Sequence, residues 1–152
     1  MPYTVHILAG KKQSIHAIHG RPAKVPAKGA ARTLLIMMHD FPGKKTDNND
    51  MYGDLEATLN EKGYHTLRFD FRGCGESDGK PEDFCLTGAY DDLHNAMLWG
   101  REKGYKRFVL IGEGLGAAIA VSAADRDIRA MVLLWPMLQS TSFRFNTSEF
   151  TG

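Results

Sequence analysis

Cysteine is scarce in this chain, since Cys74 and Cys85 are the only two among 152 residues. So few thiols build neither a disulfide framework nor a cysteine metal cage, and we expect reduced thiols in a cytoplasmic protein. The longest apolar run, Ala130 to Leu138, contains a proline and is far shorter than the roughly 18 residues of a membrane-spanning helix. The N-terminus also lacks the basic and apolar segments of a secretion signal. We therefore expect neither a membrane span nor export.

An excess of charge is also missing. The 19 basic residues stand against 18 acidic ones, for a formal net charge of +1. Such a balance gives no reason to expect a nucleic acid or an anionic membrane as a partner. With 43% apolar residues, a chain of this length can bury a core, and we expect a single domain over residues 1–152.

Short apolar segments alternate along the chain with segments of helical spacing. Tyr3 to Leu8 and Gln13 to His19 predict an antiparallel hairpin, and the apolar run Thr33 to Met38 predicts a strand buried on both faces. The other predicted elements are helices at Met51 to Lys62, Tyr90 to Lys103 and Leu115 to Ala124, and strands at His65 to Phe71, Arg107 to Ile111 and Met131 to Trp135. This order predicts an α/β protein, a three-layer α/β/α sandwich around a mostly parallel sheet of about six strands.

Three loops follow the carboxyl ends of the middle strands, where open α/β sheets place ligands. They read H-D-F-P-G at 39–43, D-F-R-G-C-G-E-S-D-G at 70–79 and G-E-G-L-G at 112–116. In these loops the sequence resembles the α/β-hydrolase superfamily, and more narrowly its esterase, lipase and serine-aminopeptidase-like members. Those proteins typically carry H-G-F-x-G, R-F-D-F-R-G-H-G-E-S-D-G and G-H-S-x-G-G in this order. The resemblance extends from Tyr3 to about Leu138 and implies the N-terminal half of that fold, with strand order 1-2-4-3-5-6.

The catalytic triad of the family is not intact in this sequence. Gly114 occupies the position of the nucleophilic serine, and glycine has no atom that could form an acyl-enzyme. No histidine follows Gly114, and the later carboxylates are Asp125, Asp127 and Glu149. The first two are expected at the opposite end of the sheet. The sequence looks shortened at its C-terminus, so that residues 139–152 resemble the start of a lid region.

What the resemblance leaves is a pocket like the family's oxyanion hole. It implies that the backbone N–H groups of Phe41 and Leu115 point into this pocket, and that Gly114 leaves room there for water or a small ligand. His39 is expected to shape the loop. Asp40 stands where the family usually has glycine, and with Glu113 it brings negative charge close to the pocket. No metal site and no cofactor are expected.

Two local patterns suggest other chemistry. Residues 75–79 form a literal G-x-S-x-G, but a proline at 81 rather than a helix follows, so we interpret Ser77 as a turn-stabilising residue and not as a nucleophile. The D-N-N-D run at 47–50 departs from a calcium loop at Met51, and a helix N-cap at Asn49 or Asp50 is the better interpretation.

Three functional hypotheses remain. The first is a catalytically inactive homologue with a residual role in binding a ligand or a partner. The second is an active hydrolase of esters or amides that uses non-standard groups or residues of a partner chain. The third is a nucleotide-binding module, because residues 112–117 also fit the G-x-G-x-x-A fingerprint; it is weakened by the lack of an acidic residue at the end of the next strand.

The last predicted strand also suggests a partner. Met131 to Trp135 is apolar on both faces and carries no lysine, which makes it a poor edge to leave in water. We expect a homodimer in which this strand and its flanking helix pair across a two-fold axis, with Phe143 to Phe150 as additional packing.

Overall fold

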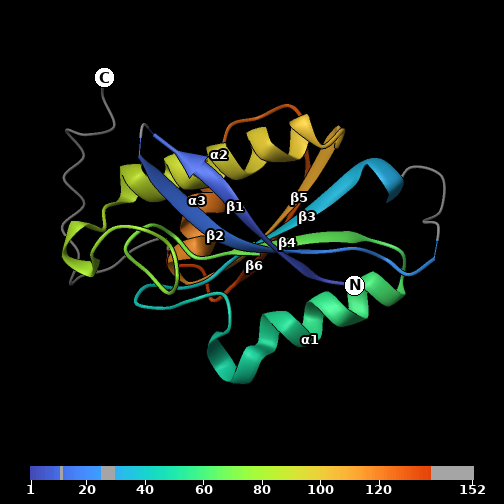
Figure 1. Ribbon diagram of the computed structural model, residues 1–152, viewed down its shortest axis with the longest axis horizontal. Coiled ribbons are helices and arrows are strands. Elements are labelled where there is room, and N and C mark those ends of the chain that lie inside the picture. Colours follow the sequence, from blue (N-terminus) through green and yellow to red (C-terminus); the bar gives the residue numbers. More distant parts are fainter. Residues whose placement is uncertain (11, 25–29, 138–152) are drawn as a thin grey trace.

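The computed structural model describes residues 1–10, 12–24 and 30–137, and a six-stranded sheet forms its centre (Figure 1). The order β1-β2-β4-β3-β5-β6 is the predicted one. β1 and β2 form an antiparallel hairpin, β2 pairs antiparallel with β4, and the other pairs are parallel. The strands are β1 (Tyr3–Ala9), β2 (Gln13–Gly20), β3 (Thr33–Met38), β4 (His65–Phe69), β5 (Arg107–Glu113) and β6 (Ile128–Leu134).

Three helices cover the two faces of this sheet (Figure 1). α1 (Asp47–Glu61) lies on one face, whereas α2 (Leu86–Glu102) and α3 (Leu115–Ser122) lie together on the other. Two short 3-10 helices, η1 (Ala30–Arg32) and η2 (Pro81–Asp83), lie in connections. The three-layer α/β/α sandwich expected from the sequence is confirmed.

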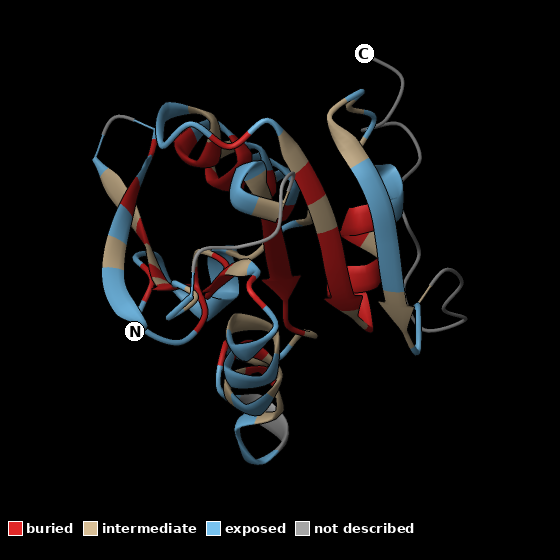
Figure 2. Cartoon of the chain, turned by 90° about the vertical axis from the view of Figure 1, so that its right-hand side faces the viewer, coloured by how far each residue is buried: buried red, intermediate tan, exposed pale blue. Residues whose placement is uncertain are grey.

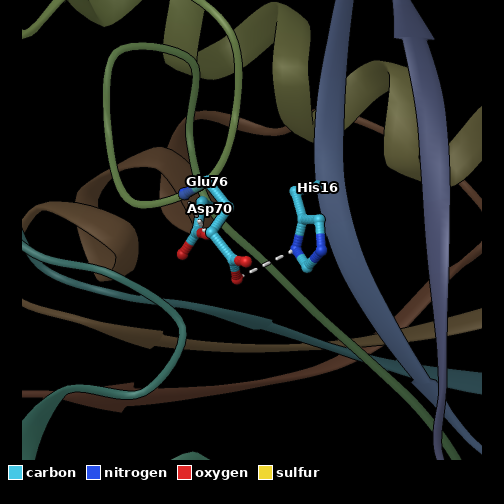
Figure 3. A group of neighbouring side chains, drawn as sticks. All are labelled: His16, Asp70 and Glu76. Atoms are coloured by element: carbon cyan, nitrogen blue, oxygen red, sulfur yellow. Dashed lines mark hydrogen bonds and ion pairs between the residues drawn. The ribbon is translucent and has the colours of Figure 1, made fainter.

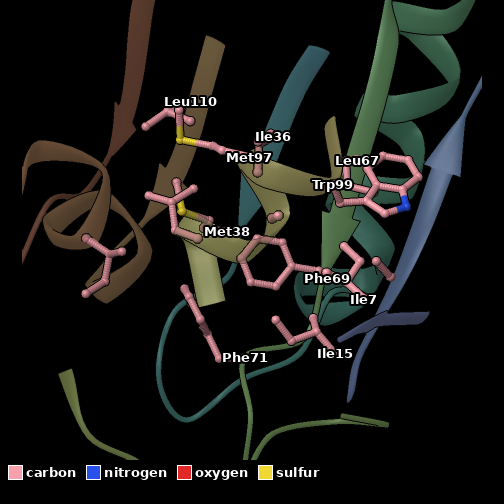
Figure 4. Packing of buried hydrophobic residues seen from close by; sticks show 14 of the residues in the cluster. Ile7, Ile15, Ile36, Met38, Leu67, Phe69, Phe71, Met97, Trp99 and Leu110 are labelled. Atoms are coloured by element: carbon pink, nitrogen blue, oxygen red, sulfur yellow. The ribbon is translucent and has the colours of Figure 1, made fainter. Parts of the chain in front are cut away.

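β3 shows why the run Thr33 to Met38 is continuously apolar. Its even-numbered residues Leu34, Ile36 and Met38 join the larger core cluster, together with residues of α2 and α3. Leu35 and Met37 point to the other face, where they pack with Tyr52 of α1. A central parallel strand is buried on both faces, so both of its residue sets must be apolar. Figure 4 shows the larger cluster, in which Ile36 and Met38 lie near Met97 and Leu110.

The start of α1 corrects the predicted N-cap. The helix begins at Asp47, four residues before the predicted Met51, and Thr46 is its N-cap residue. Asn49 and Asp50 lie inside the first turn with φ of 56° and 60°. Asp50 therefore does not cap the helix, and its carboxylate accepts a hydrogen bond from Arg68 Nη1 at 3.1 Å.

Several strand ends also differ from the prediction. β4 ends at Phe69 rather than Phe71, because Asp70 turns its carboxylate to Lys45. β6 runs from Ile128 to Leu134, three residues earlier than predicted at its start, and Trp135 lies beyond it with φ 47°. The segments 139–152 and Phe143 to Phe150, predicted as a lid remnant and as packing material, lie outside the described residues.

β6 is the most exposed of the parallel strands. Figure 2 shows pale blue along most of it, next to the largely buried β5. Met131 is 37% exposed, Val132 45% and Trp135 70%, so apolar side chains face solvent along this edge of the described sheet. Among the helices of the described residues, none is both long enough and apolar enough to cross a lipid bilayer.

Candidate functional site

Three loops meet at the carboxyl ends of β3, β4 and β5, as the sequence predicts. Residues 39–43 follow β3, residues 70–79 follow β4, and Gly114 joins β5 to α3. Since β3 lies between β4 and β5 in the sheet, the loop after β3 is positioned to contact both of the others. This end of the sheet is the candidate active site.

The turn at Gly114 has the geometry of a nucleophile elbow without a nucleophile. β5 ends at Glu113, α3 begins at Leu115, and Gly114 between them is buried with φ 53° and ψ −112°. This conformation costs a residue with a side chain about 1 to 3 kcal/mol, whereas glycine adopts it freely. The elbow thus keeps its backbone shape although the reactive side chain is missing.

The carboxylate of Asp40 fills the space beside this elbow. Its Oδ1 accepts the backbone N–H of Phe41 at 2.8 Å and the backbone N–H of Leu115 at 2.7 Å. A Cβ atom added to Gly114 would overlap the same carboxylate. The room that the sequence analysis leaves for water or a small ligand is therefore taken by a side chain of the protein itself, and that expectation is wrong.

The neighbouring polar groups at this site are engaged in structural bonds. His39 is fully buried; its Nδ1 donates to the Asp40 carbonyl oxygen at 2.6 Å and its Nε2 accepts the Phe71 N–H at 3.1 Å. The Tyr52 hydroxyl donates to the Met38 carbonyl oxygen at 2.8 Å. Burial, and then the negative charges of Glu113 and Asp40, raise the pKa of Tyr52, so this hydroxyl stays protonated. Neither ring offers a free base to a substrate.

The glycines of 112–117 have a packing explanation. A Cβ on Gly116 would overlap the backbone carbonyl groups of Met38 and His39, and one on Gly112 would overlap the backbone at Gly116. The helix α3 can therefore approach the end of β3 closely only with glycine at these positions. A pyrophosphate at this helix N-terminus would meet the Asp40 carboxylate, which already accepts the Leu115 N–H. The site does not favour a nucleotide.

Ser77 lies in the second loop, where its hydroxyl holds the turn. It donates to the Asp70 carbonyl oxygen at 2.6 Å and accepts the His16 N–H at 2.8 Å, and the residue is 9% exposed. These bonds match the turn-stabilising interpretation. They also occupy the hydroxyl that a search for G-x-S-x-G would select as a nucleophile.

A group of potential metal ligands lies nearby on β2 and the second loop. Single ligand atoms of His16, Asp70 and Glu76 lie within 4.8 Å of one another, and His16 Nδ1 is 3.5 Å from Glu76 (Figure 3). The ammonium group of Lys45 lies among them, 2.5 Å from Asp70 and 2.7 Å from Glu76. A cation of the protein thus takes the position that a metal ion would need. Lys45 is not among the residues predicted from the sequence, because no spacing in the sequence signals its role.

Asp125 and Asp127 lie before β6, at the other end of the sheet, as predicted. Both pair with Arg101 of α2, at 2.5 Å and 3.2 Å. They are too remote from Gly114 along the sheet to act as the acid of a triad there. The described residues thus bring together Phe41, Leu115, His39, Asp40 and Glu113 around Gly114, without a nucleophile among them.

Comparison with known proteins identifies the family. The family model described as serine aminopeptidase, S33, matches residues 31–148. Lysophosphatidylserine lipase ABHD12 from Gallus gallus is 30% identical over 100 residues, which are 66% of this chain and 25% of that protein. The chain thus spans about a quarter of this relative.

Two solved structures show the same fold. Est1E from Butyrivibrio proteoclasticus, with ferulic acid bound, is 26% identical with a TM-score of 0.76, over 87% of this chain and 52% of that one. The esterase Pf2001 from Pyrococcus furiosus is 22% identical with a TM-score of 0.72, over 90% of this chain and 51% of that one. The matching family model, the loop motifs and the strand order agree, and the chain belongs to the serine aminopeptidase S33 family of α/β hydrolases.

Proposed function

We propose that this chain is a catalytically inactive α/β hydrolase whose remaining role is to bind a ligand or a partner. Gly114 carries the proposal, because it stands in the elbow between β5 and α3 where the family has its serine. Acyl transfer in this family begins with attack by that side chain, and no later step replaces it. The bonds of His39 and Ser77 support the proposal, because they leave neither group free to start the reaction.

Ester hydrolysis and covalent labelling test this function. We expect the chain to hydrolyse p-nitrophenyl acetate and butyrate no faster than a buffer blank, and to remain unlabelled by a fluorophosphonate that reacts with activated serines. Ser77→Ala serves as the matched control, and it should behave like the wild type in both assays. Saturable turnover that one substitution abolishes would instead favour a hydrolase with non-standard or partner-supplied groups.

We further propose a second copy of this chain as the partner. The exposed residues Met131 and Val132 on β6 support it, together with Trp135 just beyond. Two β6 strands related by a two-fold axis can pair antiparallel and satisfy each other's edge N–H and C=O groups. Light scattering at micromolar concentration should give twice the chain mass of 16.9 kDa.

Val132→Lys is the variant that tests this interface. Val132 is 45% exposed, whereas Leu133 packs against the larger core cluster, so a lysine at 133 would disturb the fold itself. We expect Val132→Lys to give a folded monomer. Lys106→Met, an exposed change outside β6, should leave the dimer intact. A wild-type chain that scatters as a monomer would contradict the proposal.

A further inference from the structure

Asp40 links two loops that are far apart in the sequence. It follows β3, and its Oδ1 accepts the N–H of Leu115, which is 75 residues away at the start of α3. The same oxygen accepts the N–H of Phe41, at 2.8 Å against 2.7 Å for Leu115. One carboxylate oxygen thus receives two convergent backbone donors, which is how an oxyanion is held in a preorganised site. Hydrogen bonds to a charged acceptor are the stronger ones in proteins.

In its observed position, the same carboxylate leaves no room for a side chain at position 114. A Cβ at Gly114 would overlap the carboxylate carbon and both oxygens of Asp40. The position from which Asp40 holds these N–H groups is therefore open only because residue 114 is glycine. A serine at 114 and the observed position of Asp40 cannot exist together.

We propose that Asp40 is the resident anion of this site and keeps it closed to carboxylates and other small oxyanions from solution. The proposal deepens the inactive function on which it rests, since it names the group that has taken the place of a substrate oxyanion. A tethered carboxylate has an effective concentration far above that of a free one, so a free carboxylate does not displace it. Removal of the side chain should then create a binding site for small carboxylates.

Asp40→Gly with acetate is the experiment, because acetate matches the carboxymethyl group that this substitution deletes. We expect the backbone amide resonances of Phe41 and Leu115 to shift in a saturable way on titration with acetate, with a dissociation constant on the order of 10 mM. In the wild type, the same titration should leave both resonances in place. Sodium chloride at equal ionic strength separates this binding from general screening.

Two control variants separate the site from the loss of a charge. Asp40→Asn keeps an oxygen that can accept both N–H groups, so it should remain closed to acetate. Asp78→Gly deletes an exposed carboxylate that accepts the Ser14 N–H at 2.8 Å in another loop. It should leave the Phe41 and Leu115 resonances insensitive to acetate.

Either of two results would overturn the proposal. In the first, acetate does not shift the Phe41 and Leu115 amide resonances of Asp40→Gly. In the second, it shifts those of the wild type as strongly as those of the variant. Should Asp40→Gly fail to fold, hydrogen exchange on the wild type decides, because amides bound to a carboxylate are protected. Exchange of Phe41 and Leu115 at the rate of an open chain would contradict it. Ester hydrolysis by the wild type would instead contradict the proposed inactivity and leave the acetate result to be judged separately.

Discussion

Asp40 and Asp70 follow neighbouring parallel strands, and each carboxylate fills the space beside a glycine of positive φ. Asp40 fills it at Gly114 (φ 53°), and Asp70 at Gly75 (φ 51°). Both accept backbone N–H groups, but Asp70 is fully buried and also binds the Lys45 ammonium, whereas Asp40 is half-buried. A carboxylate beside a glycine therefore orders the loop after β4 in one case, and occupies the candidate site at Gly114 in the other.

The difference also separates what a family shares from what this chain has changed. Asp70 belongs to the R-F-D-F-R-G motif that the sequence shares with its family, and it orders the second loop by accepting Lys45 N at 2.6 Å and Glu76 N at 2.9 Å. Asp40 replaces a glycine of the family pattern. Asp70, the scaffold carboxylate, depends on the Lys45 cation. Asp40, the closing carboxylate, depends on the absence of a side chain at position 114.

Lys45→Met tests the scaffold half of this comparison and should have the largest effect. Removal of the ammonium leaves Asp70, which is fully buried, without its charge partner, and we expect a loss of about 3 to 5 kcal/mol in the free energy of unfolding. Chemical denaturation measures it. The exposed Lys106→Met is the control and should change stability by less than about 0.5 kcal/mol. A small effect of Lys45→Met would show that Asp70 does not depend on its cation.

Gly114→Ser tests the closing half. The serine adopts an unfavourable φ and displaces Asp40 from its two N–H donors, so we expect a loss of about 3 kcal/mol or more. In the Asp40→Gly background the same change should cost only the backbone strain, about 1 to 3 kcal/mol. Equal costs in both backgrounds would contradict the steric coupling. Ester hydrolysis should remain absent, because both ring nitrogens of His39 are engaged.

The protonation of His19, at the other end of the sheet, should make the free energy of unfolding depend on pH. Burial, and then the charge of Arg21, lowers the pKa of His19 from 6.5 to about 4, and its ring lies between the hydroxyls of Tyr3 and Tyr105. Between these two pKa values the unfolded chain binds a proton that the folded chain does not. Stability should therefore fall by about 3 kcal/mol as the pH drops from 6.5 to 4, with no contribution from His19 above 6.5.

Denaturation at several pH values measures this loss, and His19→Gln is the control because its side chain does not titrate. The variant should have a shallower pH dependence in this window. An identical dependence would assign the loss to other groups. The comparison of Asp40 with Asp70 is therefore sharpest at pH 7, where the His19 contribution is absent.

Asp40→Asn should have the smallest effect. The amide oxygen can still accept from Phe41 and Leu115, so only the charge assistance of these bonds is lost, about 1 kcal/mol. The same change at Asp70 takes from the buried Lys45 its fully buried carboxylate partner and leaves it only the exposed Glu76 carboxylate of the two, so it should cost several times more. Thermal unfolding of the two asparagine variants measures the difference. Equal losses would remove the distinction drawn between the two carboxylates.

The sequence predicts those features that depend on local pattern. The run Thr33 to Met38 coincides with β3, because a strand buried on both faces must be apolar throughout. Gly63 marks the end of α1, where its N–H donates to Asn60 and its φ is 91°. Strand order followed from the resemblance to a family.

Features that depend on distant partners were not predictable in the same way. The local pattern at the first turn of α1 predicts an N-cap, because the contact of Asp50 with Arg68, 18 residues away, leaves no local signal. β4 ends earlier than predicted because Asp70 binds Lys45, 25 residues earlier in the sequence. The position of the Asp40 carboxylate depends on a donor 75 residues away, so the sequence indicated its charge at the site but not its contact.

The two tryptophans of this chain give it an internal optical probe of β6. Trp99 is 9% exposed within the core, whereas Trp135, directly after β6, is 70% exposed. A collisional quencher such as iodide therefore reaches Trp135 and barely touches Trp99, so that the quenchable part of the fluorescence reports on one end of this strand. Whatever covers that edge, whether another copy or a different molecule, will shift the emission to shorter wavelength and protect it from the quencher, without any label attached.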